Sequence, residues 1–309
     1  MFATPIPRRH FLRTATLAAA GARSFPVSAD EARKPRSLFD GKTLAGWHAV
    51  PRLPLPITHK EFEHMPGAKL SDAMLAWFRA RPEMAALLEN KGVWKVEDGM
   101  IIGAQVPGTQ EGSYLLTDET FGDFELTLEA RPDFPTDTGF LLRALPIGGI
   151  GFQMLLDHRK DGCIGGVYGN RLGNFRAYPF VVDGDELDGF RVANLRVGTP
   201  DGASFKPEFS ASFETFRQIW RLNDWNTFRI RSTGRLPLIE IWINDTPITK
   251  LDTAKLADRV PGYDPEQIFE RIGRRGHIAL EVHDNGKMGR NRWAPGAVCR
   301  WRNLTIAEL

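Results

Sequence analysis

The chain has 309 residues, of which 42% are hydrophobic and 25% are charged, and this composition excludes a disordered, collagen-like or coiled-coil protein. Its formal net charge changes from +2 to −2 when the first 29 residues are left out, because they contain four arginines and no acid. A nearly neutral chain has no electrostatic reason to bind nucleic acid or an anionic membrane. No apolar run reaches the ~18 residues that a membrane-spanning helix needs.

The N-terminal segment has the layout of a bacterial twin-arginine export signal. The pair Arg8-Arg9 precedes Phe11-Leu12, a short and weakly apolar stretch follows, and the small residues of Val27-Ser28-Ala29 offer a cleavage site. We therefore expect residues 1–29 to be removed and the protein to be periplasmic or otherwise exported. A basic N-terminal tail is the alternative interpretation.

The twin-arginine pathway carries folded proteins, so the fold should not depend on a disulfide. Cys163 and Cys299 are the two cysteines of the chain. They could form one bridge or remain two packed thiols, and the sequence does not decide between these.

We expect residues 30–309 to form a single domain with a helical insertion at 51–93. A proline-rich stretch opens this insertion, and helical spacing follows at 71–79 and 82–89, with Ser71 or Asp72 as the first N-cap. Two further long connections cover residues 171–225 and 252–275. The second of these contains one short helix, predicted at 265–271.

The rest of the chain is a series of short strands separated by turn residues. Asp98-Gly99 predicts a tight hairpin, and Asn244-Asp245 predicts a second one less strongly. Many short strands with few helices predict an all-β protein, a two-sheet antiparallel sandwich or jelly roll. The predicted strands are 93–97, 100–105, 114–117, 124–130, 139–145, 151–156, 226–232, 239–244, 277–283 and 297–307.

Two of these strands carry polar side chains on one face and apolar side chains on the other. In 151–156, Gln153 and Asp157 share a face with Leu155, and the opposite face is apolar. In 277–283, Glu281 and His283 share a face opposite Ile278, Leu280 and Val282. We expect both polar faces to be open and to converge on one hollow, although an ordinary solvated strand face or turn would show the same pattern.

Other polar residues could line the same hollow. Arg143 is predicted to share a face with Leu141, and it could bind a sugar or form a buried ion pair. Tyr168 and Asn170 lie in a glycine-rich segment, where the tyrosine could stack on a sugar or cover the core. His158 follows Asp157 directly.

A divalent metal ion is a further candidate ligand, although no cofactor is required by any motif. Carboxylate and imidazole side chains form mixed oxygen and nitrogen sites. The candidate metal ligands are Asp157, His158, Glu281 and His283.

The ordered set of motifs across residues 37–309 resembles the 3-keto-disaccharide hydrolase family. The segments that carry the resemblance are Leu38-Phe39-Asp40-Gly41-Lys42, Gly46-Trp47, Trp94 to Gly99, Phe121 to Leu126, Thr138 to Arg143, Trp225-Asn226 and Arg302 to Ile306. The resemblance implies a jelly roll similar to concanavalin-like lectins and glucanases. It also implies action on a carbohydrate already oxidised at carbon 3, by hydrolysis or by elimination across carbons 1 and 2.

Such chemistry needs a base near the carbon-2 hydrogen and a donor at the developing enolate oxygen. We expect His283 or His158 to be the base, oriented by Glu281 and Asp157. Arg143 and Gln153 would bind the keto sugar, together with Tyr168 and Asn170. A carbohydrate-binding module without catalysis and a conventional glycoside hydrolase are the two alternatives.

Overall fold

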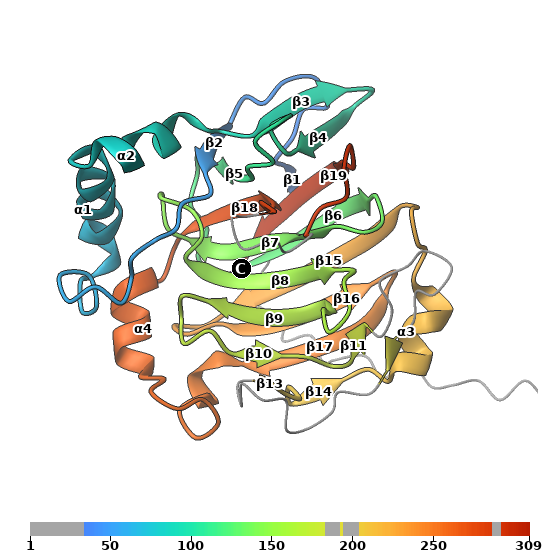
Figure 1. Cartoon of the computed structure of the whole chain (residues 1–309). Coiled ribbons are helices and arrows are strands. Elements are labelled where there is room, and N and C mark those ends of the chain that lie inside the picture. Colours follow the sequence, from blue (N-terminus) through green and yellow to red (C-terminus); the bar gives the residue numbers. More distant parts are fainter. Residues whose placement is uncertain (1–33, 183–191, 194–203, 286–291) are drawn as a thin grey trace, which may run out of the picture.

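The computed structural model describes residues 34–182, 192–193, 204–285 and 292–309. Two large sheets stack on one another and are flanked by a few helices, with β13 and β10 as the one parallel pair of described strands (Figure 1). The predicted all-β, two-sheet jelly-roll sandwich is therefore confirmed. The predicted export signal lies outside the described residues, and it stays a prediction.

The first sheet has nine strands, and all its described pairs are antiparallel. β1 (Arg36–Ser37) joins it by pairing with β19. The remaining strands, in spatial order, are β14 (Phe209–Ser210), β17 (Thr246–Asp252), β16 (Leu238–Ile243), β15 (Asn226–Thr233), β6 (Phe124–Pro132), β19 (Cys299–Glu308), β4 (Met100–Ala104) and β3 (Val93–Glu97).

The second sheet has eight strands and carries the candidate site on its outer face. A separate short pair joins β11 (Val181–Val182) to β12 (Val192–Ala193). The eight strands, in spatial order, are β13 (Ser204–Phe205), β10 (Arg176–Ala177), β9 (Ile164–Asn170), β8 (Gly151–Asp157), β7 (Asp137–Ala144), β18 (His277–Val282), β5 (Ser113–Thr117) and β2 (Trp47–Pro51).

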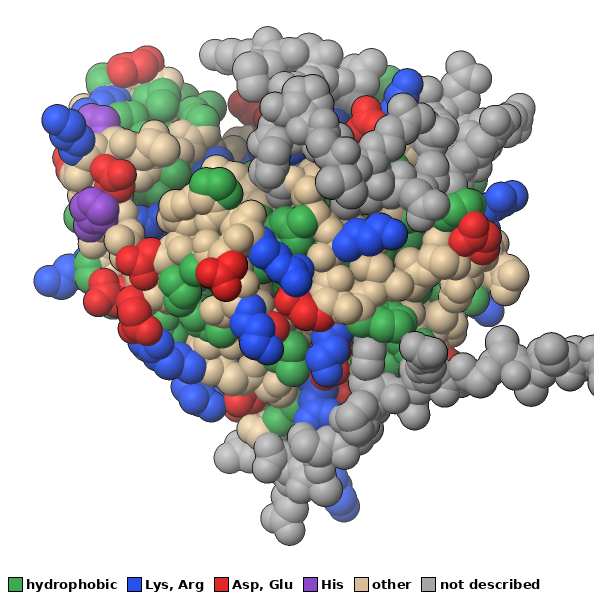
Figure 2. Space-filling model, turned by 90° about the horizontal axis from the view of Figure 1, so that it is seen from below, with side chains coloured by type: hydrophobic (Ala, Val, Ile, Leu, Met, Phe, Trp, Pro, Cys, Tyr) green, Lys and Arg blue, Asp and Glu red, His purple; other side chains and the backbone are tan. Residues whose placement is uncertain are grey.

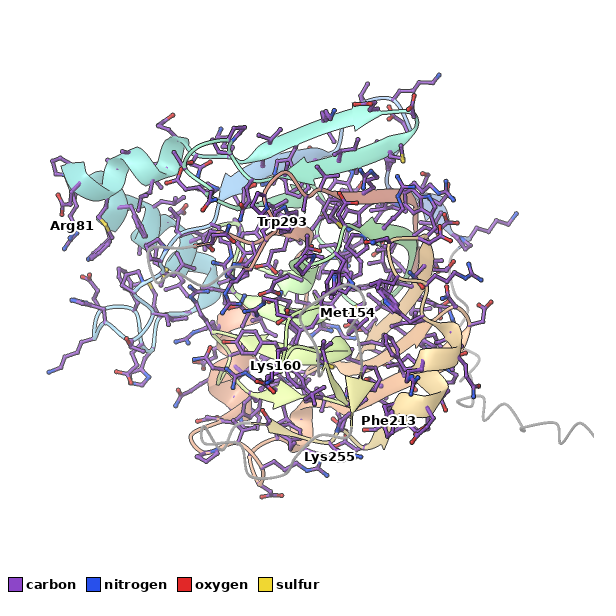
Figure 3. The ribbon with its side chains drawn as sticks, turned by 45° about the vertical axis from the view of Figure 1, so that its right-hand side comes forward. Arg81, Met154, Lys160, Phe213, Lys255 and Trp293 are labelled. Atoms are coloured by element: carbon purple, nitrogen blue, oxygen red, sulfur yellow. The ribbon has the colours of Figure 1, made fainter. Side chains whose placement is uncertain are left out.

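The hydrophobic core lies between the two sheets. Phe140 of β7 and Phe228 of β15 belong to different sheets, and their ring centroids are 5.5 Å apart. Met154 of β8 is fully buried in the same core, and Figure 3 shows it in the interior, with Lys255 at the periphery. Burial of each such side chain contributes about 1.5–3 kcal/mol to folding. The apolar faces predicted for 151–156 and 277–283 are confirmed, because Phe152, Leu156 and the three apolar residues of β18 belong to this core.

Both predicted hairpins close with backbone dihedral angles of the type I′ turn. Asp98 and Gly99 have φ values of 49° and 74°, and Asn244 and Asp245 have φ values of 47° and 63°. Positive φ at both central residues matches the right-handed twist of the flanking strands. The turns connect β3 to β4 and β16 to β17.

The insertion contains α1 (Gly67–Arg79), α2 (Pro82–Ala85) and the 3₁₀ helix η1 (Ala86–Glu89). The predicted cap is wrong, because α1 begins after Pro66 and Ser71 is buried inside the helix. The first residue of α1 is in close tertiary contact, because a Cβ on Gly67 would lie 1.7 Å from the carbonyl oxygen of Arg271. This places α1 against α4 (Pro265–Ile272), the helix predicted at 265–271, on one flank of the sandwich (Figure 1).

The helices α3 (Phe213–Ile219) and η3 (Thr253–Lys255) complete the described set, in which no helix is long and apolar enough to cross a bilayer. On the described part of the face shown in Figure 2, acidic and basic side chains are interspersed. Cys163 and Cys299 are both free and buried, which settles the two possibilities left open above.

Candidate active site

Polar side chains from three strands meet on the outer face of the eight-stranded sheet. Gln153 of β8 donates from Nε2 to the carboxylate of Glu281 on β18, and Glu281 is fully buried. Asn170 of β9 donates to Gln153 Oε1 over 3.3 Å. The amide of Gln153 reaches across β7 because Gly139 lies between: a Cβ there would be 3.2 Å from Gln153 Nε2. The two polar strand faces therefore converge as the sequence predicted. They are not open as predicted, because Gln153 is only 4% exposed and Glu281 is fully buried.

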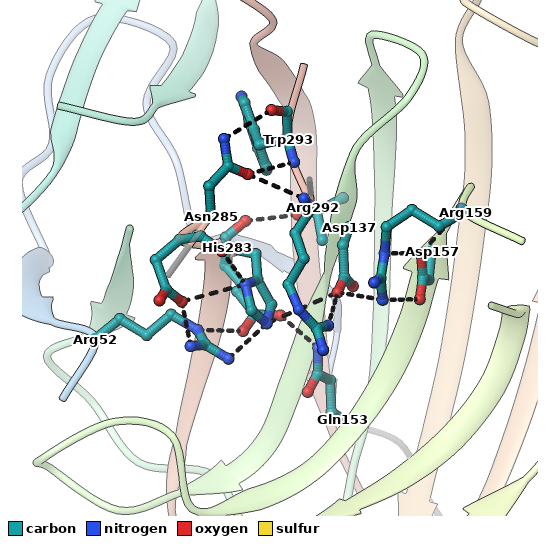
Figure 4. A network of polar contacts seen from close by, with 12 residues as sticks. Arg52, Asp137, Gln153, Asp157, Arg159, His283, Asn285, Arg292 and Trp293 are labelled. Atoms are coloured by element: carbon teal, nitrogen blue, oxygen red, sulfur yellow. Dashed lines mark hydrogen bonds and ion pairs between the residues drawn. The ribbon is translucent and has the colours of Figure 1, made fainter. Parts of the chain in front are cut away.

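Arg52, which directly follows β2, holds three of the surrounding side chains. Its Nε donates to Glu281 Oε1 over 3.1 Å, Nη1 donates to Asp284, and Nη2 donates to His283 Nε2 over 2.7 Å. Burial lowers the pKa of Arg52, but its electrostatic interactions with Tyr114, Glu281 and Asp284 outweigh burial and raise the pKa. Arg52 thus remains a cation, and Figure 4 shows it at one end of the network, beside His283.

His283 presents one nitrogen to the site as a hydrogen-bond acceptor. Its Nδ1 donates to the backbone oxygen of Asp284 over 2.7 Å, which leaves the lone pair on Nε2, where Arg52 donates. Burial would raise the pKa of Asp284, but the hydrogen bond from His283 and the charge of Arg52 lower it. His283 is 8% exposed, so this imidazole lies at the edge of the buried network.

A second group of charges continues from His283 across β7 and β8. Asp137 Oδ2 lies 3.7 Å from His283 Nε2 and accepts from Arg159 over 2.9 Å and from Arg292. Asp157, opposite Asp137 in the register, accepts from Arg159 at both carboxylate oxygens, at 2.9 and 2.6 Å. Figure 4 shows this row of alternating charges.

The two carboxyl groups of this row have opposite pKa shifts. Burial would raise the pKa of Asp137, but His283, Arg159 and Arg292 outweigh it and lower the pKa. Burial, and then the charge of Asp137, raise the pKa of Asp157 to about 7. Two adjacent carboxyl groups disfavour two negative charges, so Asp157 binds a proton more readily than Asp137 does.

His158 lies apart from this site. It directly follows Asp157 but points to the opposite side of the sheet, where its ring centroid is 5.5 Å from that of Phe134 and 5.8 Å from that of Trp220. It is fully buried. The strand period of two explains its position, because residues 156 and 158 share the inner face. His158 therefore does not face the network that holds His283.

Arg143 also lies on the inner side, and its predicted face is wrong. A register shift between β18 and β7 coincides with a φ of 52° at Arg143, and this bulge breaks the alternation. The guanidinium donates to the carbonyl oxygens of Gly234 and Arg235, over 2.6 and 2.7 Å, and lies 3.2 Å from Asp123. Burial lowers the pKa of Arg143 to about 10.

The four predicted metal ligands are not assembled. Glu281 is held by Arg52 and Gln153, Asp157 is held by Arg159, and His158 faces the core. Among the described residues, no group of three or more His, Cys, Asp or Glu side chains could hold a metal ion. Tyr168 lies on the outer face beside Leu155 and bonds to Asn174 over 3.1 Å, outside the direct network.

Residues 34–307 match a protein family described as the 3-keto-alpha-glucoside-1,2-lyase-like domain. The chain belongs to this family. The family assignment makes the chain a carbohydrate-active, hydrolase- or lyase-like protein. No curated protein matches the sequence.

Several solved structures are similar to this 3-keto-glucoside lyase-like chain, among them the following three. A candidate glycosyl hydrolase from Parabacteroides distasonis ATCC 8503 has 16% identity and a TM-score of 0.46, over 89% of this chain and 94% of that one. A laminarinase from Flavobacterium sp. UMI-01 has 9% identity and a TM-score of 0.41, over 90% and 100%. The carbohydrate-binding module CBM66 from Bacillus subtilis has 12% identity and a TM-score of 0.37, over 70% and 91%.

Several residues of the lyase-like chain's site were not predicted from the sequence. They include Arg52, Asp137, Asp284, Arg159 and Arg292, and also Tyr114 and Arg171, which contacts Asn170 over 3.0 Å. Tyr114 pairs directly with Glu281 in the register of β5 and β18, so strand alternation could have indicated it. Arg171 adjoins the predicted Asn170. Arg52 follows β2 at the start of the proline-rich stretch, where no periodic pattern indicates which way a side chain points.

The buried His158 should make this lyase-like fold sensitive to acid. Burial lowers the pKa of His158 from 6.5 to about 4. Below pH 6.5 the unfolded chain therefore binds a proton that the folded chain does not, and stability falls as the pH falls toward 4. Between pH 7 and pH 4 the free energy of unfolding should decrease in both proteins. We expect the decrease to be smaller in His158→Leu than in the wild type, by up to about 3 kcal/mol.

Urea unfolding at pH 7 and near pH 4 measures this difference. His59→Leu, at a side chain that is 55% exposed, is the matched control and should keep the wild-type dependence on pH. Equal acid sensitivity of His158→Leu and the wild type would contradict the expectation.

Proposed function

We propose that this protein cleaves 3-keto-glycosides by removing the carbon-2 proton of the keto sugar and expelling the carbon-1 substituent, with or without later addition of water. One observation carries the proposal beyond the family assignment. The acceptor nitrogen of His283 lies beside the Arg52 cation and the Gln153–Glu281 pair, on the outer face of the sheet.

The reaction is an elimination that a ketone makes accessible. The C2–H electron pair forms the C2=C3 bond, and the carbonyl π pair moves onto the carbon-3 oxygen as an enolate. The enolate then returns to the ketone. The π pair of the C2=C3 bond forms the C1=C2 bond, and the leaving oxygen takes the electron pair of the C1–O bond that breaks. That oxygen takes up a proton, and addition of water to the enone would give net hydrolysis.

In this proposal the side chains have separate roles. His283 Nε2 takes the carbon-2 proton and later returns it to the leaving oxygen. Arg52 Nη2 turns from His283 to a sugar oxygen, which frees the imidazole lone pair. Gln153 and Asn170 bind sugar hydroxyls, and the buried Glu281 fixes Arg52.

The carboxylates of the site support elimination over conventional glycoside hydrolysis. Hydrolysis of an unoxidised glycoside uses two carboxyl groups that flank the bond, one as acid and one as base or nucleophile. Here Asp137, Asp157, Glu281 and Asp284 each contact an arginine. Such contacts hold a carboxylate in place and compete with its attack on a sugar.

Incubation with a glucoside and with its 3-keto form tests the proposal. We expect release of the carbon-1 substituent from the keto form alone, because the carbon-2 hydrogen of the parent sugar is not acidic. Release from both compounds would indicate a conventional glycosidase. Binding of sugars with release from neither would indicate a carbohydrate-binding module.

A further inference from the structure

The ion pairs of the candidate site present guanidinium groups to solvent and keep most of their carboxylates beneath them. The side chains of Glu281, Asp137 and Asp157 are at most 7% exposed, whereas the arginines that pair with them are 19–24% exposed. These arginines are Arg52, Arg292 and Arg159. The carboxylate of Asp284 is the exception, because its side chain is 28% exposed. A ligand that reaches this face therefore meets mostly N–H donors, which are suited to a carbonyl or oxyanion oxygen.

Arg292 keeps two of its guanidinium nitrogens without a hydrogen-bond partner in the described part of the chain. Arg52 donates from all three of its side-chain nitrogens, and Arg159 donates from Nε and Nη2. Arg292 donates from Nη1 to Asp137, and its Nε and Nη2 have no partner within the described ranges. Solvent reaches this guanidinium, because the side chain is 22% exposed. Its two adjacent N–H groups can therefore donate together to a ligand oxygen.

The unpartnered donors lie next to the candidate base. Asp137 Oδ2 accepts from Arg292 Nη1 and lies 3.7 Å from His283 Nε2, so the guanidinium and the base meet at one carboxylate oxygen. Figure 4 shows the guanidinium of Arg292 beside His283 and Asp137. A base and an oxyanion donor act together when each lies ~3 Å from the reacting group. The pair of His283 and Arg292 is therefore placed to act on carbon 2 and on the oxygen of carbon 3.

The backbone of Arg292 is fixed by the segment that carries His283. Asn285, two residues after His283, accepts at Oδ1 from the backbone nitrogens of Arg292 and Trp293, each over 2.9 Å. Its Nδ2 donates to the backbone oxygen of Trp293 over 3.1 Å, and the Trp293 side chain is buried. A donor held in this way needs little reorganisation when charge develops, which is the condition for oxyanion stabilisation.

We propose that Arg292 binds the carbon-3 oxygen through Nε and Nη2 and stabilises the enolate as it develops. This inference rests on the proposed function and assigns a role that Arg143, on the inner side of the sheet, does not fill. When the C2–H pair forms the C2=C3 bond, the carbonyl π pair moves onto the carbon-3 oxygen, and the two N–H groups then face a full negative charge. The carbon-2 proton goes to His283, and the guanidinium keeps its own protons throughout. Donors aimed at the position where charge develops stabilise the transition state more than the ground state.

Kinetics of Arg292→Met, with a 3-keto-glucoside as the probe, test the inference. We expect a loss of roughly 10²–10³-fold in kcat with a smaller change in KM, because the interaction strengthens in the transition state. The same loss should appear in deuterium exchange at carbon 2 of a 1-deoxy-3-keto sugar in D₂O, which reports enolate formation without loss of a carbon-1 substituent. Added methylguanidinium should restore part of both rates. Arg292→Lys keeps the charge but not the paired N–H groups, so it should remain slow.

Arg300→Met is the matched control, because Arg300 is 21% exposed and also donates from Nη1 to a carboxylate, that of Asp133, but lies on β19 of the other sheet. It should keep wild-type kcat and exchange. Wild-type exchange in folded Arg292→Met or Arg292→Lys, or a change in KM alone, would overturn the role of Arg292 and leave the proposed function intact. A loss of activity that follows a loss of thermal stability and does not respond to methylguanidinium would overturn it too, as a structural effect. A wild-type protein inert toward every 3-keto sugar tried would overturn both.

Discussion

His283→Ala is expected to lose ~10²–10⁴-fold in kcat/KM on a 3-keto-glycoside, which is the usual contribution of a positioned base. The acceptor nitrogen faces the site, and Arg52 keeps its bonds to Glu281 and Asp284 when the imidazole is gone. The fold should therefore survive while proton transfer fails. Added imidazole should restore part of the rate, because it can occupy the space that the side chain leaves.

His48→Ala is the matched control for this experiment. Its imidazole is 43% exposed and contacts Asp118 over 2.6 Å, away from the Arg52 network. It should keep the wild-type rate, and both variants should show cooperative thermal unfolding. A rate for His283→Ala within a few-fold of the wild type would remove His283 from the mechanism.

The alternation of polar and apolar residues predicted the architecture of the site well. A strand period of two places Gln153 on one face of β8 and Glu281 on the corresponding face of β18, and the structure joins the two side chains. The same rule also places His158 on the inner face. We predicted His158 to be a base only because it is a histidine. The strand period of two places it on the inner face and is evidence against that role.

The wrong or missing predictions lie where a bulge, several glycines or a proline interrupt the regular strand pattern. Arg143 follows the alternation only up to a bulge, whose extra residue turns the side chain inward. The strand β9 was not predicted, because three glycines in seven residues indicate a turn rather than a strand. β17 contains Pro247 and was missed for a similar reason, since proline is rare inside a sheet.

Contacts between distant segments could not be predicted. Arg52 lies 229 positions before Glu281, and no periodic pattern of the insertion indicates that its side chain enters the site. Arg292 likewise lies 155 positions after Asp137, whose carboxylate it contacts. Residue type and strand period thus locate the polar face of the sheet, whereas its cations come from the loops that cover it.

Arg52→Met is expected to lower the free energy of unfolding by about 3–5 kcal/mol, because it leaves the fully buried Glu281 carboxylate without its cation. Methionine fills much of the same volume, so the effect should come from charge rather than from a cavity. Glu281→Gln in the Arg52→Met background should recover most of the loss, since the amide needs no counter-charge. Urea unfolding of the two single variants and the double variant measures the coupling.

Arg36→Met provides the comparison, because Arg36 also pairs with a carboxylate, that of Glu119, but the two side chains are 43% and 64% exposed. Such an exposed pair contributes at most about 1 kcal/mol. If Arg52→Met costs no more than Arg36→Met, or if Glu281→Gln does not restore stability, then Arg52 does not hold the buried carboxylate as the geometry indicates. In that case Arg52 would have a role in substrate binding and not in stability. The activity of the double variant would test that role.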